Sequence, residues 1–150
     1  SELVPNKKDL VIMIDYAHSP ESLQSILSAV KSYTRGKVIS VFGCGGDRDK
    51  AKRPIMGQIS TSIADFSIIT SDNPRTEEPE AIVKEIEAGA VKTKGKYITI
   101  VDRTEAIKHA IEMATKNDII VIAGKGHETY QEINGEKRHY DEREIIKEVI

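Results

Sequence analysis

The sequence lacks most of the features that stabilise secreted proteins, bind metal ions or cross membranes. Its 150 residues include no tryptophan and one cysteine, Cys44. A single cysteine excludes an intrachain disulfide and fits a reducing compartment such as the cytoplasm. No apolar run approaches the roughly 20 residues that a membrane-spanning helix needs, and no signal peptide is visible. With one cysteine and scattered histidines, no metal site is expected in this chain.

Charge and size point to an ordinary globular domain. The chain has 22 Lys and Arg against 24 Asp and Glu, a formal net charge of −2. That balance provides no basic surface for nucleic acid and no attraction to an anionic membrane. The apolar share of 39% with 31% charged residues is typical of a globular protein. At this length one hydrophobic core suffices, so residues 1–150 are expected to form a single domain.

Five short apolar segments organise the chain, each followed by a polar or glycine-rich turn and then, with one exception, by a helical pattern. They are residues 10–14, 38–42, 66–70, 97–101 and 119–123. Nearly continuous apolar runs are typical of strands whose two faces are both covered by helices. Strands that alternate with helices predict parallel order and right-handed crossovers. We therefore expect an α/β fold with a doubly wound, mostly parallel sheet of about six strands.

Capping residues and prolines mark the expected helix starts. Ser19 followed by Pro20 predicts an N-cap and a first helical residue. The later helices are expected to open at Pro54, Pro79, Asp102 and Asp141. The last two aspartates are each followed three residues later by glutamate, which is a capping-box pattern.

The exception comes after the fifth strand, in residues 130–140. There Asn134-Gly135 separates two short segments, and this dipeptide is a strong hairpin signal. We expect an edge hairpin near the C-terminus, which would make the sheet mixed.

The polar turns carry the candidate site residues. In open α/β sheets, ligands bind outside the carboxyl ends of the strands, so these turns should meet at one edge. They are residues 15–18, 43–49, 71–76 and 124–128. Glycines in two of them permit close backbone approach. Neither the Walker A pattern nor the dinucleotide fingerprint is present, and Lys125 resembles a Walker lysine only superficially.

Arg75 is the most constrained of these candidates. Proline at position 74 biases Asn73 toward extended geometry, which fixes the point from which Arg75 projects. Its guanidinium offers a planar fork to a carboxylate or phosphate, and Glu128 could accept a hydrogen bond from an ammonium group. Taken singly, each pattern also fits a structural role, such as a surface ion pair for Arg75 or helix capping by Asp15. Together they indicate a site for a zwitterionic or doubly charged small molecule.

Four motifs, in this order and spacing, resemble the C-terminal domain of the Mur ligases of peptidoglycan synthesis. They are Asp15-Tyr16-Ala17-His18-Ser19-Pro20, Gly43-Cys44-Gly45-Gly46-Asp47-Arg48-Asp49 with Lys52-Arg53-Pro54, Asp72-Asn73-Pro74-Arg75 and Gly124-Lys125-Gly126-His127-Glu128. The resemblance covers residues from about Leu10 to the end, and is to the members that add the third amino acid of the peptide. It implies a Rossmann-like Mur ligase C-terminal fold.

The resemblance also implies roles for individual residues. Five residues match family positions that contact the incoming amino acid, and Asp72 and Pro74 complete the turn at residues 72–75, called here the recognition turn. The seven residues are Arg48, Asp72, Asn73, Pro74, Arg75, Gly124 and Glu128. Asp15 matches the position that reaches the ATP ribose, and His18 is a weaker candidate on the nucleotide side. Family members with Arg at position 75 add meso-diaminopimelate, whose second carboxylate can pair bidentately with the guanidinium. Lanthionine presents the same two carboxylates and stays open as an alternative.

The implied reaction needs more than this chain. In the family, ATP phosphorylates the carboxylate of UDP-N-acetylmuramoyl-L-alanyl-D-glutamate, and the amine of the incoming amino acid then attacks. The N-terminal UDP-binding domain and the central ATPase domain, with its P-loop and Mg²⁺ ligands, are expected to lie outside these residues. The chain alone should therefore fold but be inactive. The alternative from another class is a stand-alone α/β domain that binds a small molecule without catalysis.

Overall fold

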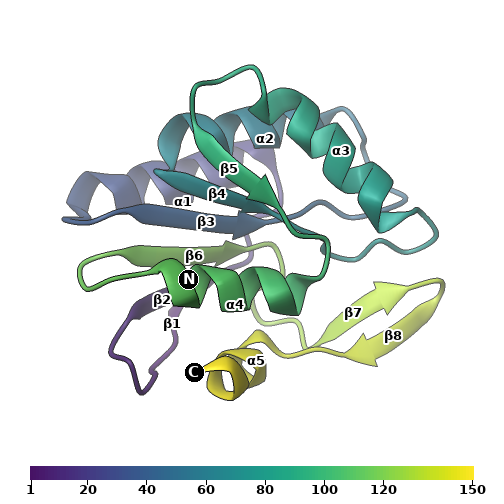
Figure 1. Cartoon of the computed structure of the whole chain (residues 1–150). Coiled ribbons are helices and arrows are strands. Elements are labelled where there is room, and N and C mark those ends of the chain that lie inside the picture. Colours follow the sequence, from purple (N-terminus) through teal and green to yellow (C-terminus); the bar gives the residue numbers. More distant parts are fainter.

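The computed structural model describes residues 1–150, and its centre is a six-stranded sheet between helices (Figure 1). The strand order is β1-β2-β6-β3-β4-β5. The strands are β1 (Glu2–Leu3), β2 (Val11–Asp15), β3 (Val38–Phe42), β4 (Phe66–Ile69), β5 (Lys96–Thr99) and β6 (Ile119–Ala123). β2 to β6 are parallel, as predicted, whereas β1 pairs with β2 in antiparallel order. The sheet is thus mixed because of its first strand.

Three helices cover one face of the sheet and two cover the other (Figure 1). They are α1 (Pro20–Tyr33), α2 (Lys52–Ile63) and α3 (Pro79–Ala90) on the first face, and α4 (Arg103–Met113) and α5 (Glu142–Val149) on the second. None of these helices combines the length and apolarity that a bilayer crossing needs.

The predicted helix starts are confirmed with one correction. Ser19 caps α1 in a capping box with Ser22, and Asp102 and Asp141 cap α4 and α5. The second helix begins at Lys52 rather than at Pro54. Proline fits there because the N–H groups of a first helical turn have no partner within the helix.

The alternating side chains of the strands create two apolar cores. A cluster of 18 buried residues lies under α1, α2 and α3, and a cluster of 13 lies under α4 and α5. In the first core, α2 and α3 contact each other backbone to backbone. A Cβ added at Gly57 would lie 2.0 Å from the carbonyl oxygen of Ile86, and one at Gly89 would lie 1.7 Å from that of Pro54. Only glycine fits at either position.

The predicted C-terminal hairpin is present, as β7 (Tyr130–Ile133) and β8 (Glu136–His139). Asn134 and Gly135 both have positive φ, as a two-residue hairpin turn of type I′ requires. The hairpin forms its own two-stranded sheet beyond the carboxyl edge of the main sheet (Figure 1). It cannot extend the main sheet directly after β6, because β6 already pairs on both sides with β2 and β3.

Candidate functional site

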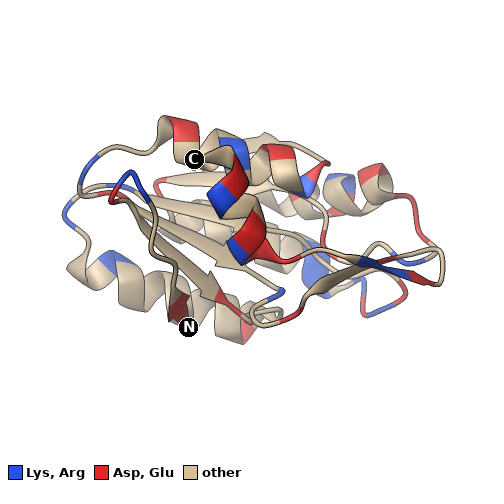
Figure 2. Cartoon of the chain, turned by 90° about the horizontal axis from the view of Figure 1, so that it is seen from below, with Lys and Arg blue, Asp and Glu red and all other residues tan.

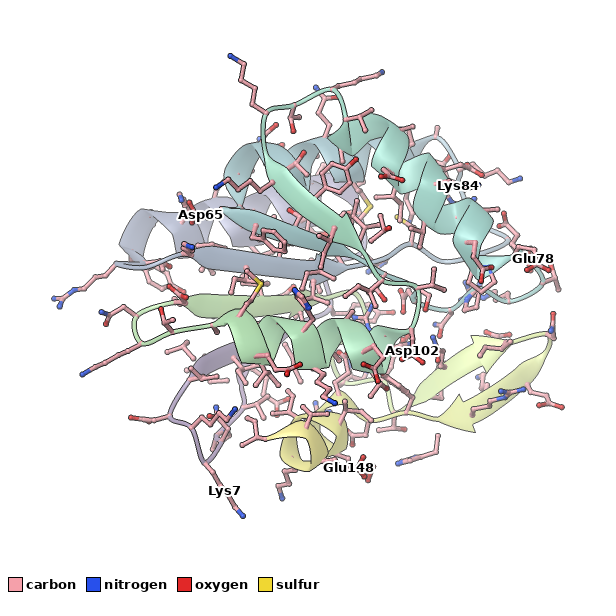
Figure 3. All side chains as sticks on the ribbon, in the orientation of Figure 1. Lys7, Asp65, Glu78, Lys84, Asp102 and Glu148 are labelled. Carbon is pink, nitrogen blue, oxygen red and sulfur yellow. The ribbon has the colours of Figure 1, made fainter.

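A cavity of about 400 Å³ lies where the predicted turns meet, at the carboxyl ends of the strands. Eleven residues line it: Tyr16, His18, Gly45, Arg48, Lys52, Asp72, Asn73, Arg75, Gly124, Glu128 and Tyr130. All four polar turns identified in the sequence contribute. In Figure 3 the carboxyl ends of the strands lie at the end of the molecule where Glu78 and Asp102 are labelled, opposite to Asp65.

The cavity brings charges of both signs together. Three cationic side chains, Arg48, Lys52 and Arg75, line it with two carboxylates, Asp72 and Glu128. Such a lining can pair with the carboxylates and the ammonium groups of one small molecule. It is a poor match for an apolar ligand or for a simple anion.

Arg75 has an unusual backbone and a fixed side chain. Its φ of 52° lies in the left-handed region, where a non-glycine residue is strained. Backbone hydrogen bonds hold it there: its N–H donates to the Glu132 carbonyl at 3.0 Å, and the N–H of Asn134 donates to its carbonyl at 2.7 Å. The guanidinium donates from Nε to Glu132 Oε1 at 3.2 Å and from Nη1 to the Gly46 carbonyl at 2.9 Å.

Asp72 and Asn73 are buried and held by an ammonium group. Lys125 is fully buried and donates from Nζ to Asn73 Oδ1 at 2.7 Å and to the Tyr130 carbonyl at 3.0 Å. The same Nζ lies 3.0 Å from Asp72 Oδ1, although the angles are not those of a hydrogen bond. Burial lowers the pKa of Lys125, which the neighbouring Asp72 carboxylate partly offsets. Lys125 therefore supports the recognition turn from beneath, a role that its flanking glycines alone do not reveal.

A second buried ion pair joins the first residues of α4 and α5 near the ends of β4 and β6. Arg103 on α4 donates from Nε to Glu142 Oε2 at 2.7 Å, and both side chains are fully buried. Arg103 also donates to the carbonyl oxygens of Ser71 at 2.9 Å and Ala123 at 3.0 Å, where β4 and β6 end. Burial raises the pKa of the Glu142 carboxyl group. Sequence reasoning missed this pair.

The charged segment at the start of α2 contributes some residues to the cavity and others to the packing around it. Arg48 and Lys52 line the cavity, whereas Arg53 is buried and donates to Glu77 Oε2 at 2.7 Å and to the Gly45 carbonyl at 3.0 Å. The Arg53 guanidinium and the backbone N–H of Asp47 lower the pKa of Glu77 to about 2. This network ties the glycine-rich turn to the segment that follows Arg75.

The glycines at positions 43 and 46 serve packing between turns. A Cβ at Gly46 would lie 1.9 Å from the Pro74 carbonyl oxygen, and one at Gly43 would lie 2.3 Å from that of Thr70. Gly46 therefore permits close approach to the turn at residues 72–75, and Gly43 to residues 70–72 just after β4, while Gly45 lines the cavity.

Two residues expected at the site do not line the cavity. Pro74 lines a neighbouring cavity of about 390 Å³ instead. Asp15 accepts a hydrogen bond from the Ala17 N–H at 2.8 Å and contacts Ser1. His18 does line the main cavity, with Nδ1 2.8 Å from the Tyr16 carbonyl oxygen. Sequence reasoning gave no site role to Tyr16, Gly45, Lys52 or Tyr130, although the first three lie within or beside the quoted motifs.

Comparison with known proteins gives consistent results. The family described as Mur ligase, glutamate ligase domain, matches residues 1–126. The UDP-N-acetylmuramoyl-L-alanyl-D-glutamate--2,6-diaminopimelate ligase of Clostridioides difficile is 53% identical over 149 residues, which cover 99% of this chain and 31% of that protein. The enzyme of the same name from Clostridium tetani is 55% identical over 139 residues, or 93% of this chain and 28% of that protein. The chain thus spans about a third of the length of these relatives.

Solved structures agree on the fold. A structure of a UDP-N-acetylmuramoyl-L-alanyl-D-glutamate--2,6-diaminopimelate ligase superposes with a TM-score of 0.92 at 42% identity, covering 99% of this chain and 30% of that one. A bifunctional folylpolyglutamate synthase/dihydrofolate synthase from Yersinia pestis, complexed with AMPPNP and Mn ion, shares the fold at 20% identity, with a TM-score of 0.61 over 85% of this chain and 28% of that one. With the match over residues 1–126, these similarities establish that the chain belongs to the Mur ligase family and corresponds to its glutamate ligase domain.

Proposed function

We propose that this chain is the C-terminal, amino-acid-binding domain of an ATP-dependent ligase of peptidoglycan synthesis. The complete enzyme would join meso-diaminopimelate to UDP-N-acetylmuramoyl-L-alanyl-D-glutamate. The observation that carries the proposal is the cavity in which Arg48, Lys52 and Arg75 face Asp72 and Glu128. The names of relatives at about half identity support the same substrate. Because those relatives are ligases, we prefer this function to that of a stand-alone binding domain.

The proposed roles follow from the charges of a diamino diacid. Glu128 and Asp72 would accept hydrogen bonds from an ammonium group, while Arg48 and Arg75 would pair with carboxylates. Asn73 and Gly124 line the same cavity, and Pro74 would shape the recognition turn from outside it. Lysine lacks the second carboxylate and would leave Arg75 without a ligand partner in a closed site. That omission would cost about 1–3 kcal/mol of binding free energy.

ATP and Mg²⁺ would be bound mainly by other parts of the enzyme. ATP supplies the phosphoryl group that activates the acceptor carboxylate. We propose that the Mg²⁺ ligands belong to the ATPase domain, outside these residues. We propose that Asp15 reaches the ATP ribose, with His18 nearby, when this domain closes over the ATPase domain.

Domain closure would explain why one site is divided between domains. A closed lid excludes water and protects an activated carboxylate from hydrolysis. We therefore propose that residues 1–150 form one domain that is inactive alone, and that the UDP-binding and ATPase domains lie elsewhere in the protein. We propose that the enzyme acts in the cytoplasm on these small-molecule substrates, without nucleic acid or a membrane.

The test is ADP release by the complete ligase with meso-diaminopimelate, lanthionine and lysine, before and after Arg75→Ala. We expect kcat/KM to fall about 10- to 100-fold for the two diacids, because a charge-assisted bidentate contact is lost, and to change little for lysine. Arg138→Ala is the matched control, since Arg138 is an exposed hairpin arginine outside the cavity. Equal losses for all three amino acids would show that Arg75 supports the fold rather than selecting the substrate.

A further inference from the structure

The β7–β8 hairpin contacts the recognition turn, residues 72–75, through a continuous set of hydrogen bonds. The side chain of Gln131 donates to the Asp72 carbonyl at 2.7 Å, and the N–H of Glu132 donates to Asn73 Oδ1 at 2.9 Å. Arg75 pairs with β7 as if it were a third strand. A two-stranded hairpin alone is marginally stable in water. The hairpin and the recognition turn therefore hold each other in place.

Within this contact, Glu132 alone places a charged side chain on Arg75. A guanidinium has five N–H groups; one donates to Glu132 and one to the Gly46 carbonyl. Three N–H groups remain for a ligand, including both on Nη2, which makes no hydrogen bond within the protein. The Arg75 side chain is only 18% exposed and lines the cavity. These unpaired donors are therefore available to a ligand that enters the cavity.

We infer that Glu132 is a positioning residue that orients Arg75 for the second carboxylate of the diamino acid. The inference rests on the proposed function of the cavity. An arginine side chain has several rotatable bonds, and fixing it before the ligand arrives removes an entropic cost from binding. Glu132, on β7, and the Gly46 carbonyl, in the glycine-rich turn after β3, hold the guanidinium from two different segments. Selection between a diacid and lysine would then depend on a residue that contacts neither of them.

Electrostatic repulsion between Glu132 and the ligand carboxylate opposes this effect. The Glu132 carboxylate also repels an incoming carboxylate, so its removal could in principle tighten binding. Glu132 is 28% exposed, however, and a charge that reaches water is screened over short distances. The cavity also keeps Arg48 and Lys52 as further cations. Orientation of the guanidinium should therefore outweigh the repulsion.

The experiment compares Glu132→Ala and Glu132→Gln in the complete ligase, with Glu136→Ala as the matched control. Glu136 lies on the same hairpin, is exposed, and forms its ion pair with Arg138, at 3.7 Å, rather than with a cavity residue. We expect Glu132→Ala to raise KM for meso-diaminopimelate about tenfold, because the ligand must then immobilise the Arg75 side chain itself. KM for ATP and for lysine should stay unchanged. Glutamine keeps an acceptor oxygen for Nε, so KM for meso-diaminopimelate in Glu132→Gln should be close to that of the wild type.

A second measurement, on residues 1–150, separates orientation from folding. In Glu132→Ala the backbone amides of Arg75 and Asn134 should keep their protection from hydrogen exchange, because their partners are backbone carbonyls. The Nε–H of Arg75, observed by NMR, should lose its protection.

Three outcomes would overturn the inference: a KM for meso-diaminopimelate equal to that of the control, a lower KM, or equal rises for meso-diaminopimelate and lysine. A wild-type ligase that releases no ADP with any diamino acid would instead refute the proposed function, whatever the Glu132 variants do.

Discussion

Replacing Arg103 by Met should destabilise the fold strongly, because it removes one partner of a buried ion pair. Glu142 would then be a fully buried carboxylate without a donor, since its Oε1 has no hydrogen-bond partner even in the native fold. The carbonyl oxygens of Ser71 and Ala123 would also lose their donor from Arg103. Breaking a buried pair in this way costs about 3–5 kcal/mol. The measured quantity is the free energy of unfolding of residues 1–150, from urea titrations followed by circular dichroism.

The thermal consequence follows from the size of the chain. An unfolding entropy of about 2.1 cal/mol/K per residue gives about 0.3 kcal/mol/K for 150 residues, so a loss of about 4 kcal/mol should lower Tm by about 13 °C. The double variant Arg103→Met with Glu142→Leu should be less destabilised than Arg103→Met alone. It removes the unpaired carboxylate and leaves only two carbonyl groups without Arg103, at about 1 kcal/mol each.

This double-mutant cycle also defines the refuting result. If Arg103→Met costs less than about 1 kcal/mol, water reaches Glu142 and the pair is not buried in solution. If the losses of unfolding free energy in the two single variants simply add in the double variant, the two side chains do not stabilise each other. Arg103 and Glu142 would then not form an ion pair in solution.

Two further predictions use titratable groups. The pKa of Glu77 is lowered to about 2, chiefly by the hydrogen bond from Arg53, so its contribution to stability is present above the unfolded pKa near 4.5 and is lost as pH falls toward 2. Glu77→Gln should therefore reduce the unfolding free energy at pH 7 but have little effect near pH 2, which urea titrations at the two pH values would test; an equal effect at both would contradict the assignment. Burial raises the pKa of the Cys44 thiol to about 12, and its Sγ lies 3.7 Å from Met56 Sδ. Cys44 should stay unreactive toward a disulfide reagent at pH 8 until urea unfolds the chain, and rapid labelling of the native protein would show the burial to be wrong.

Local patterns predicted the framework of the fold well. The strands at 38–42 and 119–123 match the expected segments residue for residue, because an uninterrupted apolar run between polar turns permits few alternatives. The N-caps Ser19 and Asp102 were equally evident, since each precedes a helical pattern directly. The meeting of the polar turns around one cavity follows from parallel strand order.

Features that depend on distant parts of the chain could not be predicted in this way. Arg103 and Glu142 are 39 residues apart and look like the exposed charges of two surface helices until the fold buries them together. Lys125 looks like an exposed charge in a loop, because the sequence does not show that the hairpin covers it. The hairpin itself was evident from Asn134-Gly135, but its attachment to Arg75 depends on which strand edges are already occupied.

The backbone contact between α2 and α3 has a consequence for ligand length. Lys52 is the first residue of α2 and Arg48 lies in the loop before it, whereas Arg75 precedes α3. Because Gly57 and Gly89 leave no space between the two helices, the helices fix the spacing of the segments that carry Lys52 and Arg75 into the cavity lining. A methyl group at either glycine, far from any ligand, would widen that spacing and change which chain length between two carboxylates fits best.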